Sequence, residues 1–153
     1  MLRLKGSERM ESIGQDKEKH LEFIQSNIAR MNQCSFQMKG WMITLVTALL
    51  ALFAASYNSI EKTGNNLFIF IAAFPAILFW FLDSYYLQQE RKMRGLYKDI
   101  IDTTSQKKIA NFSFPLDSYK GGKYKLLNVM FSITEWPLYL LTCLALIIAG
   151  IVL

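Results

Sequence analysis

Charged side chains are missing from three long stretches of the chain. Residues 40–60, 63–82 and 136–153 contain no Asp, Glu, Lys or Arg and are rich in apolar side chains. A helix needs about 20 mainly apolar residues to cross the hydrocarbon core of a bilayer. Because each stretch has close to that length, the pattern predicts an all-α membrane protein with three transmembrane helices.

An apolar stripe with helical spacing extends the first span on its N-terminal side. Its members alternate steps of three and four residues, which returns each of them to the same helix face. They are Leu21, Ile24, Ile28, Met31, Ser35 and Met38, continued in the span by Met42, Leu45, Leu49, Leu52 and Ser56. The stripe predicts one helix over residues 17–60. As a coiled-coil seam, it also predicts a contact between copies of the chain in a homo-oligomeric helical assembly.

Breakers and charge delimit the remaining segments. Residues 1–16 are expected to form a flexible tail, and residues 61–66 a short external turn because they are rich in Gly and Asn. Residues 67–101 keep helical spacing beyond their apolar part, so the second span is also expected to extend into the cytoplasm. Residues 102–125 are expected to form a basic and aromatic cytoplasmic loop, and residues 126–153 to lead into and form the third span.

The positions of Lys and Arg predict the orientation in the membrane. Of the 17 Lys and Arg residues, only Lys62 lies in the turn between the first two spans, and the others lie within residues 1–39 and 83–125. Cytoplasmic segments of membrane proteins carry the excess of Lys and Arg. The N-terminus and residues 83–125 are therefore expected in the cytoplasm, with the turn and the C-terminus outside.

Composition argues against a disulfide framework, a metal centre and an enzyme. Cys34 and Cys143 form no C-x-x-C pair, and His20 is the one histidine. The sequence contains no P-loop, dinucleotide-binding or nucleophile-elbow motif, so we expect no catalytic residue, metal site or cofactor. Since Glu18 and Glu22 flank His20, we expect this residue on a solvated helix surface, with pH sensing as the alternative.

Small and hydroxylated residues mark one face of the first span. Thr44, Thr47 and Ala51 are candidates for pore lining, because Thr hydroxyls can meet water, although small residues four apart also permit close helix packing. The candidates for a cytoplasmic gate or seam are Leu21, Ile24, Ile28, Met31, Gln33 and Asp83. Asp83 either attracts cations to an oligomeric pore or pairs with a basic residue such as Arg30, Lys39 or Arg91.

Basic and aromatic side chains also mark the cytoplasmic part after the second span. Basic groups attract phosphates, and aromatic rings stack on the bases of single-stranded nucleic acid. The same composition suits a loop held against the anionic headgroups of a lipid bilayer. The candidate ligand-binding residues are Arg91 and Arg94 on the helix and Lys107, Lys108, Tyr119, Lys120, Lys123, Tyr124 and Lys125 in the loop.

Two parts of the sequence resemble one family of proteins. The first contains Lys19-His20-Leu21-Glu22-Phe23-Ile24-Gln25, Ile28-Ala29-Arg30-Met31, Ser35-Phe36 and Lys39-Gly40-Trp41. The second contains Phe79-Trp80-Phe81-Leu82-Asp83-Ser84-Tyr85-Tyr86-Leu87, Glu90-Arg91 and Leu96-Tyr97. Over residues 17–101 the chain resembles small bacterial membrane effectors that accompany nucleotidyltransferases in antiphage defence, in particular the effector of Hailong-type systems.

This resemblance implies an oligomeric ion channel whose opening depolarises the bacterial inner membrane. It also implies control by a nucleotide second messenger or a short single-stranded oligonucleotide, made by a partner nucleotidyltransferase. Our working hypothesis is a homotetramer whose first helix lines the assembly axis and whose cytoplasmic helices form the gate. The alternative is a non-conducting membrane anchor or adaptor that holds a cytoplasmic partner protein.

Overall fold

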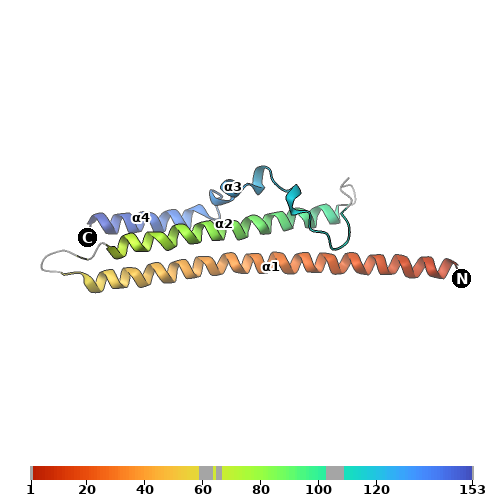
Figure 1. Cartoon of the computed structure of the whole chain (residues 1–153), viewed down its shortest axis with the longest axis horizontal. Coiled ribbons are helices and arrows are strands. Elements are labelled where there is room, and N and C mark those ends of the chain that lie inside the picture. Colours follow the sequence, from red (N-terminus) through yellow and green to blue (C-terminus); the bar gives the residue numbers. More distant parts are fainter. Residues whose placement is uncertain (1, 59–63, 65–66, 103–108, 153) are drawn as a thin grey trace.

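A helical hairpin forms the body of the molecule (Figure 1). The computed structural model describes residues 2–58, 64, 67–102 and 109–152, and within them the side chains from Ser12 to Gly150. Helix α1 (Leu2–Ser56) runs the length of the molecule, and α2 (Leu67–Ile101) returns along it. Helix α4 (Trp136–Val152) packs against α2, at the end of the molecule opposite the N-terminus. The described residues are therefore almost entirely helical, as the sequence predicts.

Helix α1 begins at Leu2, so the prediction of a flexible tail over residues 1–16 is wrong. Most of these residues are good helix formers, and Gly6 and Gly14 each cost only about 1 kcal/mol relative to Ala within a helix. Extending an existing helix avoids the cost of nucleation, which explains why the long helix continues through them. At its other end α1 stops at Ser56, four residues before the predicted end.

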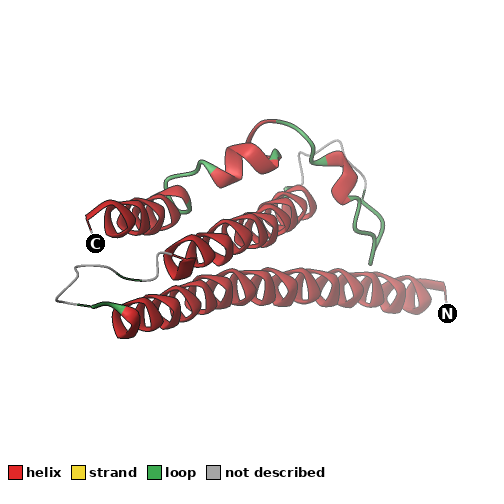
Figure 2. Ribbon diagram, turned by 60° about the vertical axis from the view of Figure 1, so that its left-hand side comes forward, coloured by secondary structure: helices red, strands yellow, loops and turns green. Residues whose placement is uncertain are grey.

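Helix α2 has the predicted bounds, from Leu67 to Ile101. Most of the predicted turn over residues 61–66 lies outside the described residues, as do residues 103–108 of the predicted loop. The rest of the loop contains two short 3-10 helices, η1 (Leu116–Ser118) and η2 (Gly122–Tyr124), and leads through α3 (Leu126–Met130) to α4. Figure 2 shows α3 on the side of α2 that faces away from α1, whereas the loop before η1 reaches down to α1.

The helices enclose two separate hydrophobic cores. One contains Met42, Val46 and Phe53 of α1, together with residues of α2 and α4. The other lies nearer the N-terminal end of α1, where Ile24 of α1 packs with Leu96 of α2 and Tyr119. Within the described chain, the predicted stripe on α1 packs against α2 of the same molecule as far as Met42. Beyond Met42 the prediction is wrong, because Leu45, Leu52 and Ser56 are exposed and Val46 and Phe53 are buried instead. Its use as a contact between copies of the chain stays a prediction.

The outer surface around the first core is strongly apolar. Helices α1 and α2 are long and apolar enough to cross a membrane, whereas the apolar part of α4, Trp136–Gly150, is shorter. Only 22% of the most apolar part of α1 and 33% of that of α2 is buried. Phe70, Phe74 and Ile148 are among the large apolar side chains left exposed. Such a surface fits contact with lipid better than contact with water.

Candidate functional site

A groove of about 460 Å³ lies between α1, α2 and η2, beside the hydrophobic core that contains Ile24. Its walls carry four cationic side chains and, among the described residues, no acidic one. The lining residues are Gln25, Ile28, Arg91, Arg94, Gly95, Tyr97, Lys98 and Lys123. We call this feature the basic groove.

Helix geometry brings the cations of the basic groove together. Arg91, Arg94 and Lys98 follow one another at steps of three and four residues, so they share one face of α2. Lys123 belongs to η2, and its backbone carbonyl accepts a hydrogen bond from Arg91 Nη1 at 3.5 Å. Arg94 Nε donates to the buried carboxylate of Glu90 one turn earlier. Arg94 is exposed and lines the groove, so its guanidinium is accessible to an anion as well.

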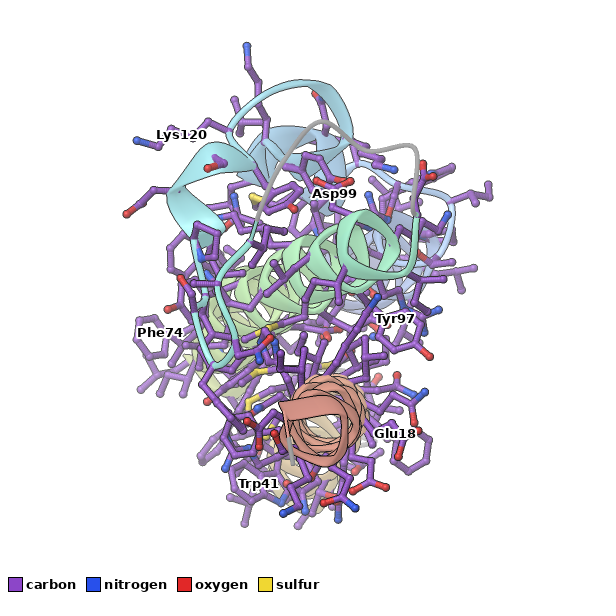
Figure 3. The ribbon with its side chains drawn as sticks, turned by 90° about the vertical axis from the view of Figure 1, so that its right-hand side faces the viewer. Glu18, Trp41, Phe74, Tyr97, Asp99 and Lys120 are labelled. Carbon is purple, nitrogen blue, oxygen red and sulfur yellow. The ribbon has the colours of Figure 1, made fainter. Side chains whose placement is uncertain are left out.

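The opposite wall of the groove is tied to α2 by one hydrogen bond. Gln25 Nε2 on α1 donates to the Tyr97 hydroxyl at 2.7 Å. Figure 3 looks along the helices and shows Tyr97 between α2 and α1. A ligand that binds in this groove would therefore contact both long helices and the segment that contains Lys123.

The predicted ligand-binding residues divide into several groups. Arg91, Arg94 and Lys123 line the basic groove. Lys120 and Lys125 are exposed and do not line it, and Lys120 projects away from the helices in Figure 3. Lys107 and Lys108 lie outside the described residues. Lys98 and Tyr97 are new members, and the regular spacing of Lys98 after Arg91 and Arg94 was the signal that could have identified it.

Tyr119 cannot stack on a ligand base, contrary to the prediction for this residue. Its ring is buried, and its hydroxyl donates to Asp99 Oδ2 at 2.7 Å. Burial and the neighbouring Asp99 carboxylate raise the pKa of Tyr119, so the hydroxyl keeps its proton. Tyr124 packs edge-on against the Tyr119 ring and lies beneath the Lys123 ammonium. Both tyrosines therefore support the wall of the groove from behind.

A second polar site lies where the uncharged run of α1 begins, directly before Gly40. Lys39 Nζ lies 2.5 Å from Asp83 Oδ2 and 3.0 Å from Glu135 Oε1, so it bridges two carboxylates from distant parts of the chain. Asp83 also accepts hydrogen bonds from Ser35 Oγ and, at 2.8 Å, from the Tyr139 hydroxyl. We call these five residues the buried polar cluster, and they connect α1, α2 and α4.

This cluster decides between the two interpretations of Asp83. The Asp83 side chain is 0% exposed and pairs with Lys39, which was one of the partners proposed from the sequence. It lies inside the molecule, so in a single chain it is not on a surface that meets permeating ions. Glu135, which is 2% exposed, was not among the residues predicted from the sequence. Its position as the last charged residue before an uncharged run could have identified it.

The remaining gate and seam candidates differ in their surroundings. Ile24 is fully buried, and Leu21, Ile28 and Met31 are partly buried. Gln33 is exposed, on the side of α1 away from this core. These positions show which face of α1 packs against α2, and a role in gating stays a prediction.

The pore-lining candidates share one exposed face of α1. Thr44, Thr47 and Ala51 are all exposed. The Thr44 hydroxyl donates to the carbonyl of Gly40 at 2.9 Å, and the Thr47 hydroxyl to that of Ile43 at 2.6 Å. Each hydroxyl has satisfied its donor within the helix and offers its oxygen lone pairs outward.

His20 is buried, contrary to the expected solvated position. Its ring lies against the rings of Phe112 and Phe114, with centroid distances of 5.6 and 5.4 Å. Its Nε2 is buried without a hydrogen-bond partner. Burial lowers the pKa of His20, and a hydrogen bond with the Ser113 backbone opposes this change. A neutral His20 therefore holds the segment around residue 113 against α1.

The basic groove can bind an anion, and the buried polar cluster can bind or release a proton. No protein-family model, no curated protein and no solved structure matches this chain.

Proposed function

We propose that copies of this chain assemble into an ion channel, as a homotetramer, that depolarises a bacterial inner membrane under the control of an anionic cytoplasmic ligand. One observation supports a channel: a continuous, uncharged and partly polar face of α1 is exposed and extends into the apolar part of this helix. Its members alternate steps of four and three residues and are Gln33, Gln37, Gly40, Thr44, Thr47 and Ala51.

This face suits a path for water and ions better than a contact with lipid. Large apolar side chains cover the exposed surfaces of α2 and α4, including Phe70, Phe74 and Ile148. The α1 face instead presents amides, hydroxyls and small residues, and polar groups at membrane depth usually face protein or water. A single hairpin encloses no path, so several copies must bring this face to a common axis.

The basic groove supplies a physical means of ligand control. Arg91, Arg94 and Lys98 carry like charges on one face of α2, and an anion bound between them and Lys123 would offset their mutual repulsion. Because Gln25 and Tyr97 belong to different helices, a bound ligand would favour one relative position of α1 and α2. A ligand shifts a conformational equilibrium only through such a difference in affinity between states.

The biological setting of the proposal rests on the sequence resemblance to effectors of antiphage defence. In that setting the ligand is a nucleotide second messenger or a short single-stranded oligonucleotide, and depolarisation stops the growth of the infected cell. Phosphate groups are the chemistry that four clustered cations recognise.

Membrane potential in bacterial cells is the measurement that tests the channel. The chain is expressed alone and together with the product of the gene next to its own in the genome, and a voltage-sensitive dye reports the membrane potential. A loss of potential only without the neighbour indicates a restrained channel, and a loss in both cases an ungated one. An unchanged potential in both cases, with the chain present in the membrane, contradicts conduction by the chain as expressed.

Two matched variants locate the conducting face. Thr44→Leu/Thr47→Leu makes the α1 face apolar, which should dry a pore and preserve the potential. Thr142→Leu is the control, because Thr142 on α4 also donates its hydroxyl to a carbonyl one turn earlier, at 2.8 Å from Leu138. Equal loss of potential in both variants would remove the α1 face from the channel.

Binding of short single-stranded oligonucleotides and cyclic dinucleotides to the purified protein tests the groove. Increasing salt should weaken binding, because a polyanion releases counterions when it binds cations. Arg91→Ala/Lys98→Ala should abolish binding, whereas Lys120→Ala/Lys125→Ala, outside the groove, should preserve most of it. If only the second pair reduces binding, the ligand site is in the loop.

A membrane anchor or adaptor is the second candidate, and one observation favours it. Residues 12–19 of α1 are exposed on every side, and Figure 1 shows this end of α1 projecting beyond α2. A projecting helix end is suited to contact with a cytoplasmic protein. Unchanged membrane potential, together with copurification of the neighbouring gene product that is lost when residues 2–19 are deleted, would support this function.

A further inference from the structure

The buried polar cluster contains more negative than positive charge. Lys39 contributes one positive charge, and Asp83 and Glu135 contribute two carboxyl groups, which are 0% and 2% exposed. An unpaired charge in such surroundings is strongly unfavourable, and a buried carboxyl group usually gains a proton instead. Ionisation of both carboxyl groups would therefore leave one negative charge without a partner.

The hydrogen bonds indicate which carboxyl group is ionised. Asp83 receives donors from Ser35, Tyr139 and Lys39, and each of these stabilises a carboxylate. Among the described residues, the one donor to Glu135 is Lys39 Nζ, at 3.0 and 3.2 Å from its two oxygens. Lys39 Nζ contacts both carboxyl groups, so Asp83 and Glu135 share this one cation. With one cation for two buried carboxyl groups, the group with fewer donors is the one expected to gain a proton.

We propose that the Lys39–Asp83–Glu135 cluster is a proton-binding site that holds one proton, on Glu135, while α1, α2 and α4 are packed together. Lys39 is 22% exposed and gives the site its contact with solvent, so the proton can exchange. The Ser35 and Tyr139 hydroxyls that face the site remain neutral donors. Loss of the proton leaves an extra charge among three helices, which loosens the attachment of α4.

The electrostatic surroundings agree with this geometry. Burial is the largest cause that raises the pKa of Glu135, and the hydrogen bond and the charge of Asp83 raise it further, while Lys39 lowers it, with a result of about 7. A folded-state pKa above the unfolded value means that the stabilisation is complete below about pH 4.5 and is lost as pH rises through 7. The proposal concerns the folded chain and holds whether or not the chain conducts ions.

Infrared spectroscopy of the purified full chain tests the site, because a protonated carboxyl group has its own carbonyl band. The parent protein should keep one such band well above the pH range of ordinary carboxyl groups and lose it with a midpoint near 7. Glu135→Gln should abolish the band. Glu90→Gln is the matched control, because Glu90 is also buried but forms a balanced pair with Arg94, and this variant should keep the band.

Two further variants separate a proton site from a merely structural cluster. Asp83→Asn leaves Lys39 and Glu135 as a balanced pair, so the band should disappear at neutral pH. Lys39→Met removes the cation, so the midpoint should move to higher pH. The proposal is wrong if the parent has no band above pH 5, if the band survives Glu135→Gln, or if Lys39→Met leaves the midpoint unchanged or lowers it.

Discussion

Replacement of Gly95 by Ala tests how α2 packs against the segment that completes the basic groove. Gly95 is buried on α2, and a Cβ at this position would lie 2.5 Å from the Tyr124 hydroxyl and 3.0 Å from Tyr119 Cε1. Tyr119 has little freedom to move, because its hydroxyl is bonded to Asp99 at 2.7 Å. The added methyl group should therefore push Tyr124 and the adjoining Lys123 away from α2.

The expected net effect is a destabilisation of about 1 kcal/mol. Gly→Ala inside a helix contributes about 1 kcal/mol of stability through backbone entropy. Overpacking a close contact costs about 1–3 kcal/mol. With a middle value of about 2 kcal/mol for Gly95, the overpacking outweighs the helix gain. Displacement of Lys123 should also weaken anion binding in the groove.

Denaturant unfolding in detergent, followed by circular dichroism, measures this change. Gly14→Ala is the control, since a Cβ there meets nothing within 4 Å and stability should stay equal or rise. The double variant Gly95→Ala/Tyr124→Phe removes the closest atom and should recover part of the lost stability. If Gly95→Ala is as stable as Gly14→Ala, the described packing of this segment is incorrect.

Three other predictions concern the loop, the core and the topology. Because burial lowers the pKa of His20 from 6.5, its contribution to loop docking should be complete above pH 6.5 and decline as the pH falls below it. Limited proteolysis of the loop should therefore become faster in acid. His20→Phe should remove this dependence on pH. Ile24→Asp should unfold the core around Leu96 and Tyr119 by burying an unpaired charge, seen as lost helical circular dichroism, whereas Gln33→Asp on the exposed face should not. A reporter fused after Leu153 should appear outside the cytoplasm and one inserted at Gly121 inside; a cytoplasmic reporter after Leu153 would overturn the three-span topology.

The helices could be predicted from the sequence because their signals are local. The apolar run and helical spacing of residues 67–101 predict both ends of α2. The stripe that includes Ile24 and Met38 shows which face of α1 is buried, but spacing on one helix does not reveal the partner. The structure assigns α2 of the same chain to this face, where the sequence favoured a second copy.

Long-range contacts explain what the sequence could not show. Lys39 was one possible partner of Asp83, but Lys39 also binds Glu135, which lies 96 positions away along the chain. Tyr119 and His20 carry polar atoms and lie among charged neighbours, which is typical of exposed residues. Both are buried because the loop packs against α1 and α2, and no local sequence pattern predicts this contact between the loop and the helices.

Ion flux through lipid vesicles that contain only the purified chain tests the channel most directly. Vesicles loaded with K⁺ are diluted into a Na⁺ medium, where valinomycin sets a K⁺ diffusion potential that a voltage-sensitive dye reports; this potential should collapse when the channel conducts other ions. Addition of a short single-stranded oligonucleotide or a cyclic dinucleotide should change the flux, and Arg91→Ala/Lys98→Ala should abolish that response. We predict ion flux with the parent protein, which Thr44→Leu/Thr47→Leu eliminates and Thr142→Leu preserves. If vesicles with the parent protein stay sealed, both with and without these ligands, the chain does not form a channel.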